Sequence, residues 1–375
     1  MNPPIDCTAA KAAFVPLLQQ IQKQNLQQLH WSTSTRQNPQ ELKWLKDFVE
    51  QNSQPLDEPL KVRIHQEFFD CGPLSQLIFD TEITEIILNG PEKIFYEKAG
   101  NFFSHPDHFY SDVTFHNFID RICQEAKICI DLNQPTANGN WRGLRLHLVG
   151  PPLSEPNICL TLRRHPENPW TLDQLSAAQW CQPNTKNILT KLVEQHSNLL
   201  IVGPTGCGKT SVLNALLQMI PPLQRVICIE DTKEVFLPNS MSCRLLTRQM
   251  NNDTLRSFDQ SDLVRESLRM RPERLVVGEI RGAEAKDLIL ALSTGHRGCM
   301  STLHAHSAKE ALLRLEMLVQ LGAPQWSLTT IRNMIRFALD YVIELEIKDK
   351  QRKLKSIQRL CSIEATGYVI EEVLF

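Results

Sequence analysis

The residues with the clearest chemical potential form the segment from Gly203 to Thr210, which has the sequence GPTGCGKT. It fits the phosphate-binding pattern G-x-x-x-x-G-K-[ST] and lies between an apolar run and a helix-like run, Ser211–Met219. Glycines in such a loop let backbone N–H groups approach phosphates, and the start of the next helix favours negative charge. Lys209 would reach the β and γ phosphates, and Thr210 would hold Mg²⁺. The segment predicts binding of ATP or GTP by Gly203, Pro204, Thr205, Gly206, Cys207, Gly208, Lys209, Thr210 and Ser211.

Two acidic residues follow the next apolar run, Val226–Ile229. Ligands of an open α/β sheet bind at the carboxyl ends of its strands, so Glu230 is placed to activate a water molecule as general base. Asp231 and Glu234 could support the metal or orient Glu230. Acids after a strand are more often helix caps than catalysts, and the phosphate-binding loop upstream is what favours the catalytic interpretation here.

A third apolar run, Arg274–Val277, leads through Gly278 into Glu279 and Arg281. An acid at this point of a phosphate-loop fold normally orients Mg²⁺ through water. We predict this metal role for Glu279. The alternative is a surface carboxylate that pairs with Arg281.

The fourth run passes through Ser301, Thr302 and Leu303 into two histidines, His304 and His306. A lone histidine is more often structural than catalytic, and an i, i+2 pair is a weaker zinc signal than an i, i+4 pair with an acid. A histidine at a strand end can also hydrogen-bond a γ phosphate and respond to its loss. We predict this sensing role for His304 and assign His306 no firm role.

The elements that must position these residues alternate between short apolar strands and helical patterns from about residue 171 onward. This rhythm predicts an α/β fold with a mostly parallel sheet covered by helices. Residues 58–165 predict a smaller α+β domain, with strands at 83–88 and 94–97, a helix at 115–128, and alternating apolar residues at 144–148 and 158–162.

Residues 1–57 predict a helical extension of two packing helices. The first is indicated by Leu18, Ile21, Leu26 and Leu29, and the second by Leu42, Leu45, Phe48 and Val49. We therefore expect domains at 1–57, 58–165 and 166–375, with a linker near 165–170.

Composition narrows the class of protein. The 375 residues include 40 Lys plus Arg and 42 Asp plus Glu, for a net charge of −2. This balance argues against a dedicated nucleic-acid binder. The 11 cysteines include no CxxC pair, which favours reduced thiols over a zinc ribbon or a disulfide framework. The start shows no signal-peptide pattern, and no apolar run approaches the roughly 20 residues of a membrane span, so a cytosolic protein is expected.

The order of the motifs resembles a known family. The phosphate loop, IEDTKE, VGEIRG and STLHAHS are similar to the Walker A, Asp box, Walker B and His box of the type II/IV secretion ATPases. Leu263–Leu318 looks like the CpaF/TadA-like branch that serves tight-adherence (Tad/Flp) pili. Cys71–Gly90, Gly143–Pro152 and Ile158–Arg164 resemble the amino-terminal domain of that branch, so the resemblance covers about residues 60–345.

The resemblance implies a homohexameric ring with a RecA-like P-loop NTPase domain and ATP bound between the two domains. Hydrolysis with Mg²⁺ would drive an inner-membrane platform, from the cytoplasmic face and by peripheral membrane contact alone. Catalytic roles would fall on Glu230, Glu279 and His304. Arg145 and Arg163 match strands whose arginines close over the nucleotide and would neutralise transition-state charge, and Arg281 is a further candidate.

The sequence departs from the family pattern at three places. Asn138–Arg142 stands where an Asp-Ala-Arg triplet is usual, His306 replaces an Asn, and Arg297 replaces an Asp. The first change leaves open a nucleotide-binding regulator or scaffold with little hydrolysis. A nucleic-acid translocase is the third hypothesis, which the charge balance disfavours. Because Cys207 lies inside the phosphate loop, its alkylation is expected to block nucleotide binding, and ATP to protect it.

Overall fold

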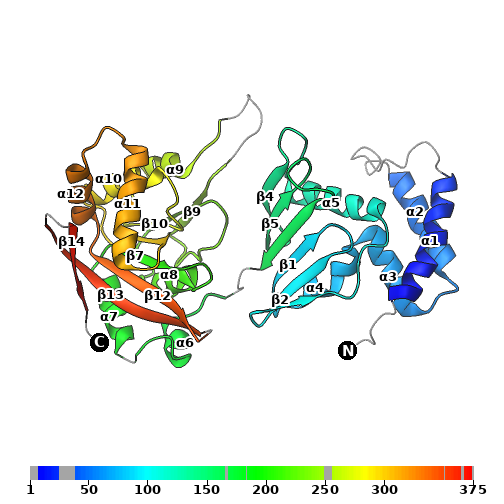
Figure 1. The fold of residues 1–375 in the computed structure, drawn as a ribbon, viewed down its shortest axis with the longest axis horizontal. Helices are drawn as coiled ribbons and strands as arrows, with labels where there is room; N and C mark the ends of the chain where they lie inside the picture. The colour runs from blue at the N-terminus through cyan, green and yellow to red at the C-terminus, as the bar shows by residue number, and fades with distance from the viewer. Residues whose placement is uncertain are drawn as a thin grey trace. The chain divides into compact units, whose positions relative to one another are not determined.

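The computed structural model describes residues 7–24, 39–164, 168–182, 184–248, 256–349, 351–364 and 367–373 of the 375-residue chain. The chain forms two compact units, Met1–His165 and Pro166–Phe375, which follow one another from blue to red in Figure 1. The predicted linker at 165–170 lies partly outside the described residues, and Leu26 and Leu29 lie wholly outside them. The division of the first unit at residue 57 stays a prediction.

Three helices open the first unit: α1 Cys7–Gln24, α2 Pro39–Ser53 and α3 Glu58–Phe69. Asp57 caps α3 by accepting a hydrogen bond from the Leu60 N–H. The three helices share one apolar core, which buries side chains at helical spacing. The core side chains are Ala10, Phe14, Leu17, Ile21, Leu45, Val49, Ile64, Phe68 and Tyr110.

The rest of the first unit is a six-stranded antiparallel sheet in the order β3-β2-β1-β6-β5-β4. Its helix α5 runs from Asp112 to Ala126, because Ser111 caps its start and Lys127, at φ +55°, ends it before the predicted limit. The other elements are η2 Gly72–Leu74, α4 Ser75–Phe79, β1 Ile83–Asn89, β2 Ile94–Lys98, β3 Asn101–Ser104, β4 Thr136–Trp141, β5 Leu144–Val149 and β6 Cys159–Arg164.

The second unit contains an eight-stranded sheet in the order β14-β13-β12-β7-β11-β10-β8-β9. The run from β12 to β9 is parallel throughout, and β13 and β14 add an antiparallel edge. The strands are β7 Leu199–Gly203, β8 Val226–Glu230, β9 Cys243–Leu246, β10 Arg274–Val277, β11 Met300–His304, β12 Tyr341–Lys348, β13 Gln351–Glu364 and β14 Gly367–Glu372.

Helices cover both faces of this sheet, as Figure 1 shows for α10, α11 and α12 on one side. Successive strand residues face opposite layers: Leu200 and Val202 pack with α9 to α12, and Leu199 and Ile201 pack with α6 to α8. The α/β fold predicted from the sequence is confirmed. The helices are α6 Leu172–Ala177, α7 Thr185–Glu194, α8 Lys209–Leu217, α9 Gln260–Ser267, α10 Glu284–Ser293, α11 Ala308–Gly322 and α12 Leu328–Ala338.

The parallel strands fix where the predicted site residues meet. Gly203, Glu230 and His304 are the last residues of β7, β8 and β11, and Glu279 follows the end of β10. Strand β11 lies between β7 and β10, so these ends share one edge of the sheet. Among the described residues, no helix has the length and apolar character that a bilayer crossing requires.

Candidate functional site

The phosphate-loop segment is a strand-to-helix turn, since Gly203 ends β7 and Lys209 begins α8. Gly206 and Gly208 have φ values of +77° and +94°, in the left-handed region that favours glycine. A Cβ on Gly203 would lie 2.6 Å from the Cys207 Sγ and 2.8 Å from the Leu345 carbonyl oxygen. Glycine is therefore required here by both conformation and space.

The Lys209 side chain lies folded into this turn and is only 7% exposed. Its Nζ donates to the carbonyl oxygens of Gly203 and Pro204, both at 2.9 Å, and lies 3.1 Å from Nδ1 of His304. These contacts use all three ammonium hydrogens. Burial lowers the pKa of Lys209, with neighbouring groups such as Glu279 opposing it. The ammonium group is held at the centre of the loop, where phosphate oxygens could replace the carbonyls.

His304 joins Lys209 to Glu279. Its Nε2 lies 3.0 Å from Oε1 of Glu279. Because an ammonium group can only donate, Nδ1 must accept, and we assign the ring proton to Nε2, which donates to Glu279. Burial, followed by the charge of Lys209, lowers the pKa of His304, although Glu279 opposes this. A neutral imidazole thus connects the phosphate loop with the acid that follows β10.

Glu279 also accepts a hydrogen bond from Nη2 of Arg281, whose Nη1 lies 3.7 Å from Oδ2 of Asp231. Burial acts to raise the pKa of Glu279, but Arg281, His304 and Lys209 outweigh it, and the pKa lies below its ordinary value. Glu279 therefore pairs with Arg281, as the alternative interpretation predicted, and also lies next to His304 and the phosphate loop. The result is an ionised carboxylate within a continuous chain from Lys209 to Asp231.

The described residues contain no group of three or more His, Cys, Asp and Glu side chains that could hold a metal ion alone. Mg²⁺ does not need such a group, because it usually binds one or two protein oxygens together with water and substrate phosphates. The hydroxyl of Thr210, next to Lys209, and the carboxylate of Glu279 are oxygen ligands of this kind. The donor set fits Mg²⁺ carried by a nucleotide.

Glu230 is 3% exposed at the end of β8, and both of its oxygens are engaged. Oε1 accepts from the backbone N–H groups of Glu234 at 2.9 Å and Val235 at 2.7 Å. Oε2 accepts from Nε of Arg244, on β9, at 2.7 Å. Burial raises the pKa of Glu230, while Arg244 and the two N–H groups act to lower it. A carboxylate has about four acceptor positions, so one remains on Oε2.

Asn214, on α8, connects the phosphate-loop helix to the loop after Glu230. Its Oδ1 accepts from the Phe236 N–H at 2.8 Å, and its Nδ2 donates to the Glu234 carbonyl at 3.3 Å. The side chain is 5% exposed. A displacement of α8 would therefore reach the residues that hold the Glu230 carboxylate.

The other predicted loop residues occupy different environments. Thr205 and Gly206 are exposed, and Thr210 and Ser211 are half-buried at the start of α8. Cys207 is 1% exposed and packs into the apolar core under the loop, and burial raises the pKa of its thiol. Reactive cysteines are partly exposed and have lowered pKa values. The structure therefore predicts slow alkylation of Cys207 in the native chain, and the expected block of nucleotide binding stays a prediction.

His306 lies outside the hydrogen-bond chain. It is exposed, and its backbone N–H donates to Oε2 of Glu310 at 2.9 Å near the start of α11. Arg297, the other departure within this unit, forms an ion pair with Asp340 at 3.0 Å. Neither contact involves the residues at the end of β7, β8 or β10.

Arg145 and Arg163 lie in the first unit, directly opposite each other on β5 and β6. Their neighbours Leu144, Leu146 and Leu162 face the core, so the two arginines project from the other face of the sheet. Arg163 also pairs in register with Glu85 of β1. The two arginines thus form a cationic pair on one sheet face, and their predicted role at the nucleotide remains a prediction.

Sequence reasoning missed Arg244 and Asn214. Neither belongs to one of the four motifs, and β9 itself was not predicted. Arg244 interrupts a short apolar run, Cys243–Leu246, two positions after a serine. A basic residue in a strand beside β8 is the signal that could have identified a partner for Glu230.

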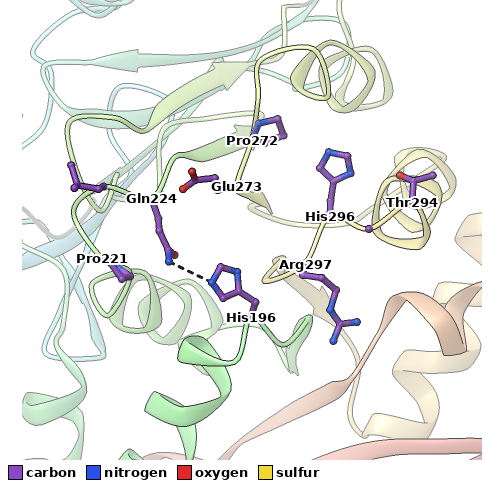
Figure 2. A pocket seen from close by; sticks show the side chains of 10 residues that line it. His196, Pro221, Gln224, Pro272, Glu273, Thr294, His296 and Arg297 are labelled. Atoms are coloured by element: carbon purple, nitrogen blue, oxygen red, sulfur yellow. Dashed lines mark hydrogen bonds between the residues drawn. The ribbon is translucent and has the colours of Figure 1, made fainter.

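The amino ends of the same strands surround a hollow with a volume of about 840 Å³. Figure 2 shows its side chains, which come from four loops that precede β7, β8, β10 and β11. His196 and Gln224 meet within it, with their Nε2 atoms 3.4 Å apart. The lining residues are His196, Pro221, Leu223, Gln224, Pro272, Glu273, Thr294, Gly295, His296 and Arg297.

Comparison with known proteins places this geometry in a family. The family model described as Type II/IV secretion system protein matches residues 67–351. A Mycobacterium tuberculosis (strain CDC 1551 / Oshkosh) protein whose name refers to conjugal transfer is 31% identical over 266 residues, covering 69% of this chain and 76% of that protein. The type IV secretion system protein PtlH of Bordetella pertussis is 30% identical over 297 residues, covering 71% and 86%.

A solved structure supports the fold. The Legionella pneumophila ATPase DotB matches with a TM-score of 0.55 at 20% identity, covering 78% of this chain and 80% of that chain. The family match extends over most of the chain and includes all four motif segments of the site. The chain belongs to the Type II/IV secretion system protein family.

Proposed function

We propose that this chain is an ATP-hydrolysing motor of a pilus-assembly or secretion machine. The observation that carries the ATPase assignment is the hydrogen-bond chain from Lys209 through His304 to Glu279. It joins the first residue of the helix after the glycine-rich turn to side chains at the carboxyl ends of β11 and β10, which is where a nucleotide phosphate would bind. Membership of the Type II/IV secretion system family supports the kind of machine.

In this proposal, the loop N–H groups and Lys209 hold the β and γ phosphates, while Thr210 and Glu279 hold Mg²⁺. The metal, when bound, neutralises charge on the phosphates. Glu230 accepts a proton from the attacking water at the acceptor position that remains on Oε2. His304, which donates through Nε2, would exchange partners when the γ phosphate leaves and so report its loss.

The assembly is proposed on the resemblance of the motifs. Residues 166–375 would form the RecA-like domain of a hexameric ring, and Leu263–Leu318 supports the CpaF/TadA-like, tight-adherence branch. Arg145 and Arg163 would neutralise transition-state charge at the nucleotide. The ring would act on an inner-membrane platform protein, at the cytoplasmic face and through peripheral contact.

The test is phosphate release by the full-length chain with Mg²⁺ and ATP, measured across a range of protein concentrations. We expect turnover that rises with assembly and requires Mg²⁺. Glu230→Gln should bind ATP but lose turnover by about 10²-fold or more. Glu273→Gln, which changes an acid at the amino ends of the strands, is the matched control and should keep turnover.

A wild-type chain that binds ATP without turnover at every concentration would overturn the motor assignment. That result would favour the nucleotide-binding regulator or scaffold.

A further inference from the structure

Arg244 closes a ring of hydrogen bonds around the Glu230 carboxylate. Its Nε donates to Oε2 of Glu230 at 2.7 Å, and its Nη2 donates to the carbonyl oxygen of Val235. The Val235 N–H donates in turn to Oε1 of Glu230 at 2.7 Å. The three residues are thus tied pairwise, and each carboxylate oxygen has its own donor.

The ring is buried and sterically confined. The side chains of Glu230 and Arg244 are 3% and 15% exposed. On the far side, a Cβ on Gly278 would lie 3.1 Å from Cγ of Glu230. Residue 278 therefore has to be small for the glutamate to take this position, and the carboxylate has little room to rotate.

We propose that Arg244 is a positioning residue for Glu230: it aims the carboxylate and clamps the loop that follows β8. This inference rests on the proposed function, in which Glu230 activates water. The planar guanidinium supplies donors in a fixed fork, so one side chain orients both the carboxylate and the Val235 carbonyl. A lysine could supply the charge but not the fork.

The electrostatics agree with this geometry. Burial works against the ionised form of Glu230, and Arg244 is the cation that offsets it. Cys228, on β8, interacts electrostatically with both Glu230 and Arg244, and burial raises the pKa of its thiol to about 12. Cys228 is therefore neutral at working pH and adds no charge to the pair.

The clamp also has a mechanical consequence. Val235 adjoins Glu234 and Phe236, whose backbones are bound by Asn214 of α8. Arg244 and Asn214 therefore hold the same short loop from β9 and from the phosphate-loop helix. A shift of α8 on nucleotide exchange would be passed to the Glu230 carboxylate through this loop.

The kinetic test compares Arg244→Gln, Arg244→Lys and a matched control. In Arg244→Gln, kcat should fall by about 10²-fold with little change in KM for ATP, because misplacing a reacting group costs about that much. The acid limb of its kcat profile should also move to higher pH, since the buried Glu230 loses its cation. In Arg244→Lys, the acid limb should return toward the wild-type position while kcat stays low.

The control is Arg225→Gln. Arg225 precedes β8 at the opposite end, and its side chain donates to the backbone carbonyls of Met270 and Met241. The Arg225→Gln variant should have a lower thermal midpoint of unfolding, and the pH profile of its kcat should not move. If Arg244→Gln changes kcat and the profile no more than Arg225→Gln does, the role of Arg244 is only structural and the proposal is overturned.

A second measurement needs no turnover. A double-mutant cycle on the stability of the full chain, with Arg244→Gln and Glu230→Gln, should show that the two changes are coupled. Additive effects would overturn the positioning role even in an active enzyme. Coupled effects in a chain that never hydrolyses ATP would show that Arg244 holds Glu230 in place and would overturn the proposed function instead.

Discussion

The two ends of the parallel sheet in the second unit use polar residues differently. At the carboxyl ends, side chains bond to one another: Lys209 to His304, His304 to Glu279, and Glu230 to Arg244. At the amino ends, Arg225 and Arg274 donate to the backbone carbonyls of Met241, Met270 and Val193. Side chains bonded to side chains can exchange partners when a ligand arrives, whereas side chains bonded to backbone hold the fold.

Arg274 shows the amino-end pattern. It is 1% exposed at the start of β10, its Nη2 donates to the Val193 carbonyl at 3.0 Å, and its Nε donates to Oε1 of Gln224 at 2.8 Å. Burial lowers the pKa of this guanidinium, and Glu273 opposes the shift. The residue fastens α7 and the loop before β8 to β10. We infer that the carboxyl ends of the strands carry the chemistry, and that the polar residues at the amino ends stabilise the fold. We call these the chemical end and the bracing end of the sheet.

Lys209→Ala should have the largest effect on turnover. Removal of the ammonium group takes away a donor to the charge that develops during phosphoryl transfer, which costs about 10²–10³-fold in kcat. Folding should survive, because water can occupy the space that the side chain leaves and donate to the two backbone carbonyls. The measurements are phosphate release and binding of a fluorescent ATP analogue.

Lys191→Ala, in the last turn of α7, is the control, and its turnover should match the wild type. Equal losses in the two variants would contradict the division of the sheet into a chemical end and a bracing end.

His304→Gln should have a smaller effect, of about tenfold in kcat, because glutamine can replace only one of the two hydrogen bonds and the lost one, to a charged group, is worth about 1.5 kcal/mol. Its pH dependence is more telling. The pKa of His304 in the folded chain lies below the ordinary value of 6.5, so the unfolded chain binds the proton more readily. The stability advantage of wild type over His304→Gln is then present above pH 6.5 and declines as the pH falls toward the folded-state pKa.

Urea unfolding of both proteins between pH 5 and 8 checks this. An advantage that grew on acidification would mean that the imidazole is charged in the folded chain. That result would contradict the assignment of Nδ1 as an acceptor from Lys209.

The sequence was sufficient to place the site residues that come directly after an apolar run. The glycine-rich turn, Glu230, Glu279 and His304 all follow apolar runs, and the carboxyl ends of parallel strands must share an edge. The partners were not predictable in this way. Arg244 reaches Glu230 only because β9 pairs with β8 at Cys228, a register that depends on the tertiary fold.

The same limit applies to the fold. Alternation in Leu144, Leu146 and Leu148 was enough to predict β5, whereas β4 carries Thr136, Asn138 and Asn140 and shows no apolar alternation. The strand exists because β5 offers it an antiparallel partner. The burial of Cys207 could not be predicted from the sequence either, because it depends on the close approach of Leu345, on β12, to Gly203.

Gln224→Ala tests the bracing end. The change removes the acceptor for Nε of the buried Arg274, and an unsatisfied buried donor costs about 1–3 kcal/mol of stability. Turnover at a temperature where the variant is folded should stay within about twofold of wild type. Urea unfolding and phosphate release measure the two effects. A stable variant with impaired turnover would show that this end of the sheet also takes part in the chemistry.

The smallest expected effect is that of ATP on the alkylation of Cys207. This residue belongs to the phosphate loop by sequence, but its side chain does not face the nucleotide side. Its thiol lies in the chemical end of the sheet, yet it faces the apolar core, 1% exposed, and burial raises its pKa. The thiolate is the reactive form, so alkylation of the native chain should be slow with or without ATP. The exposed Cys129 provides the reference rate in the same sample.

Site-by-site mass spectrometry after iodoacetamide treatment measures both cysteines. We expect Cys129 to be labelled rapidly and Cys207 to be labelled only on unfolding, with no ATP dependence in the native state. Fast labelling of Cys207 that ATP suppresses would mean that the loop opens far enough to turn its core-facing thiol outward. The phosphate loop would then be a mobile element, and its glycines would serve motion as well as close backbone approach.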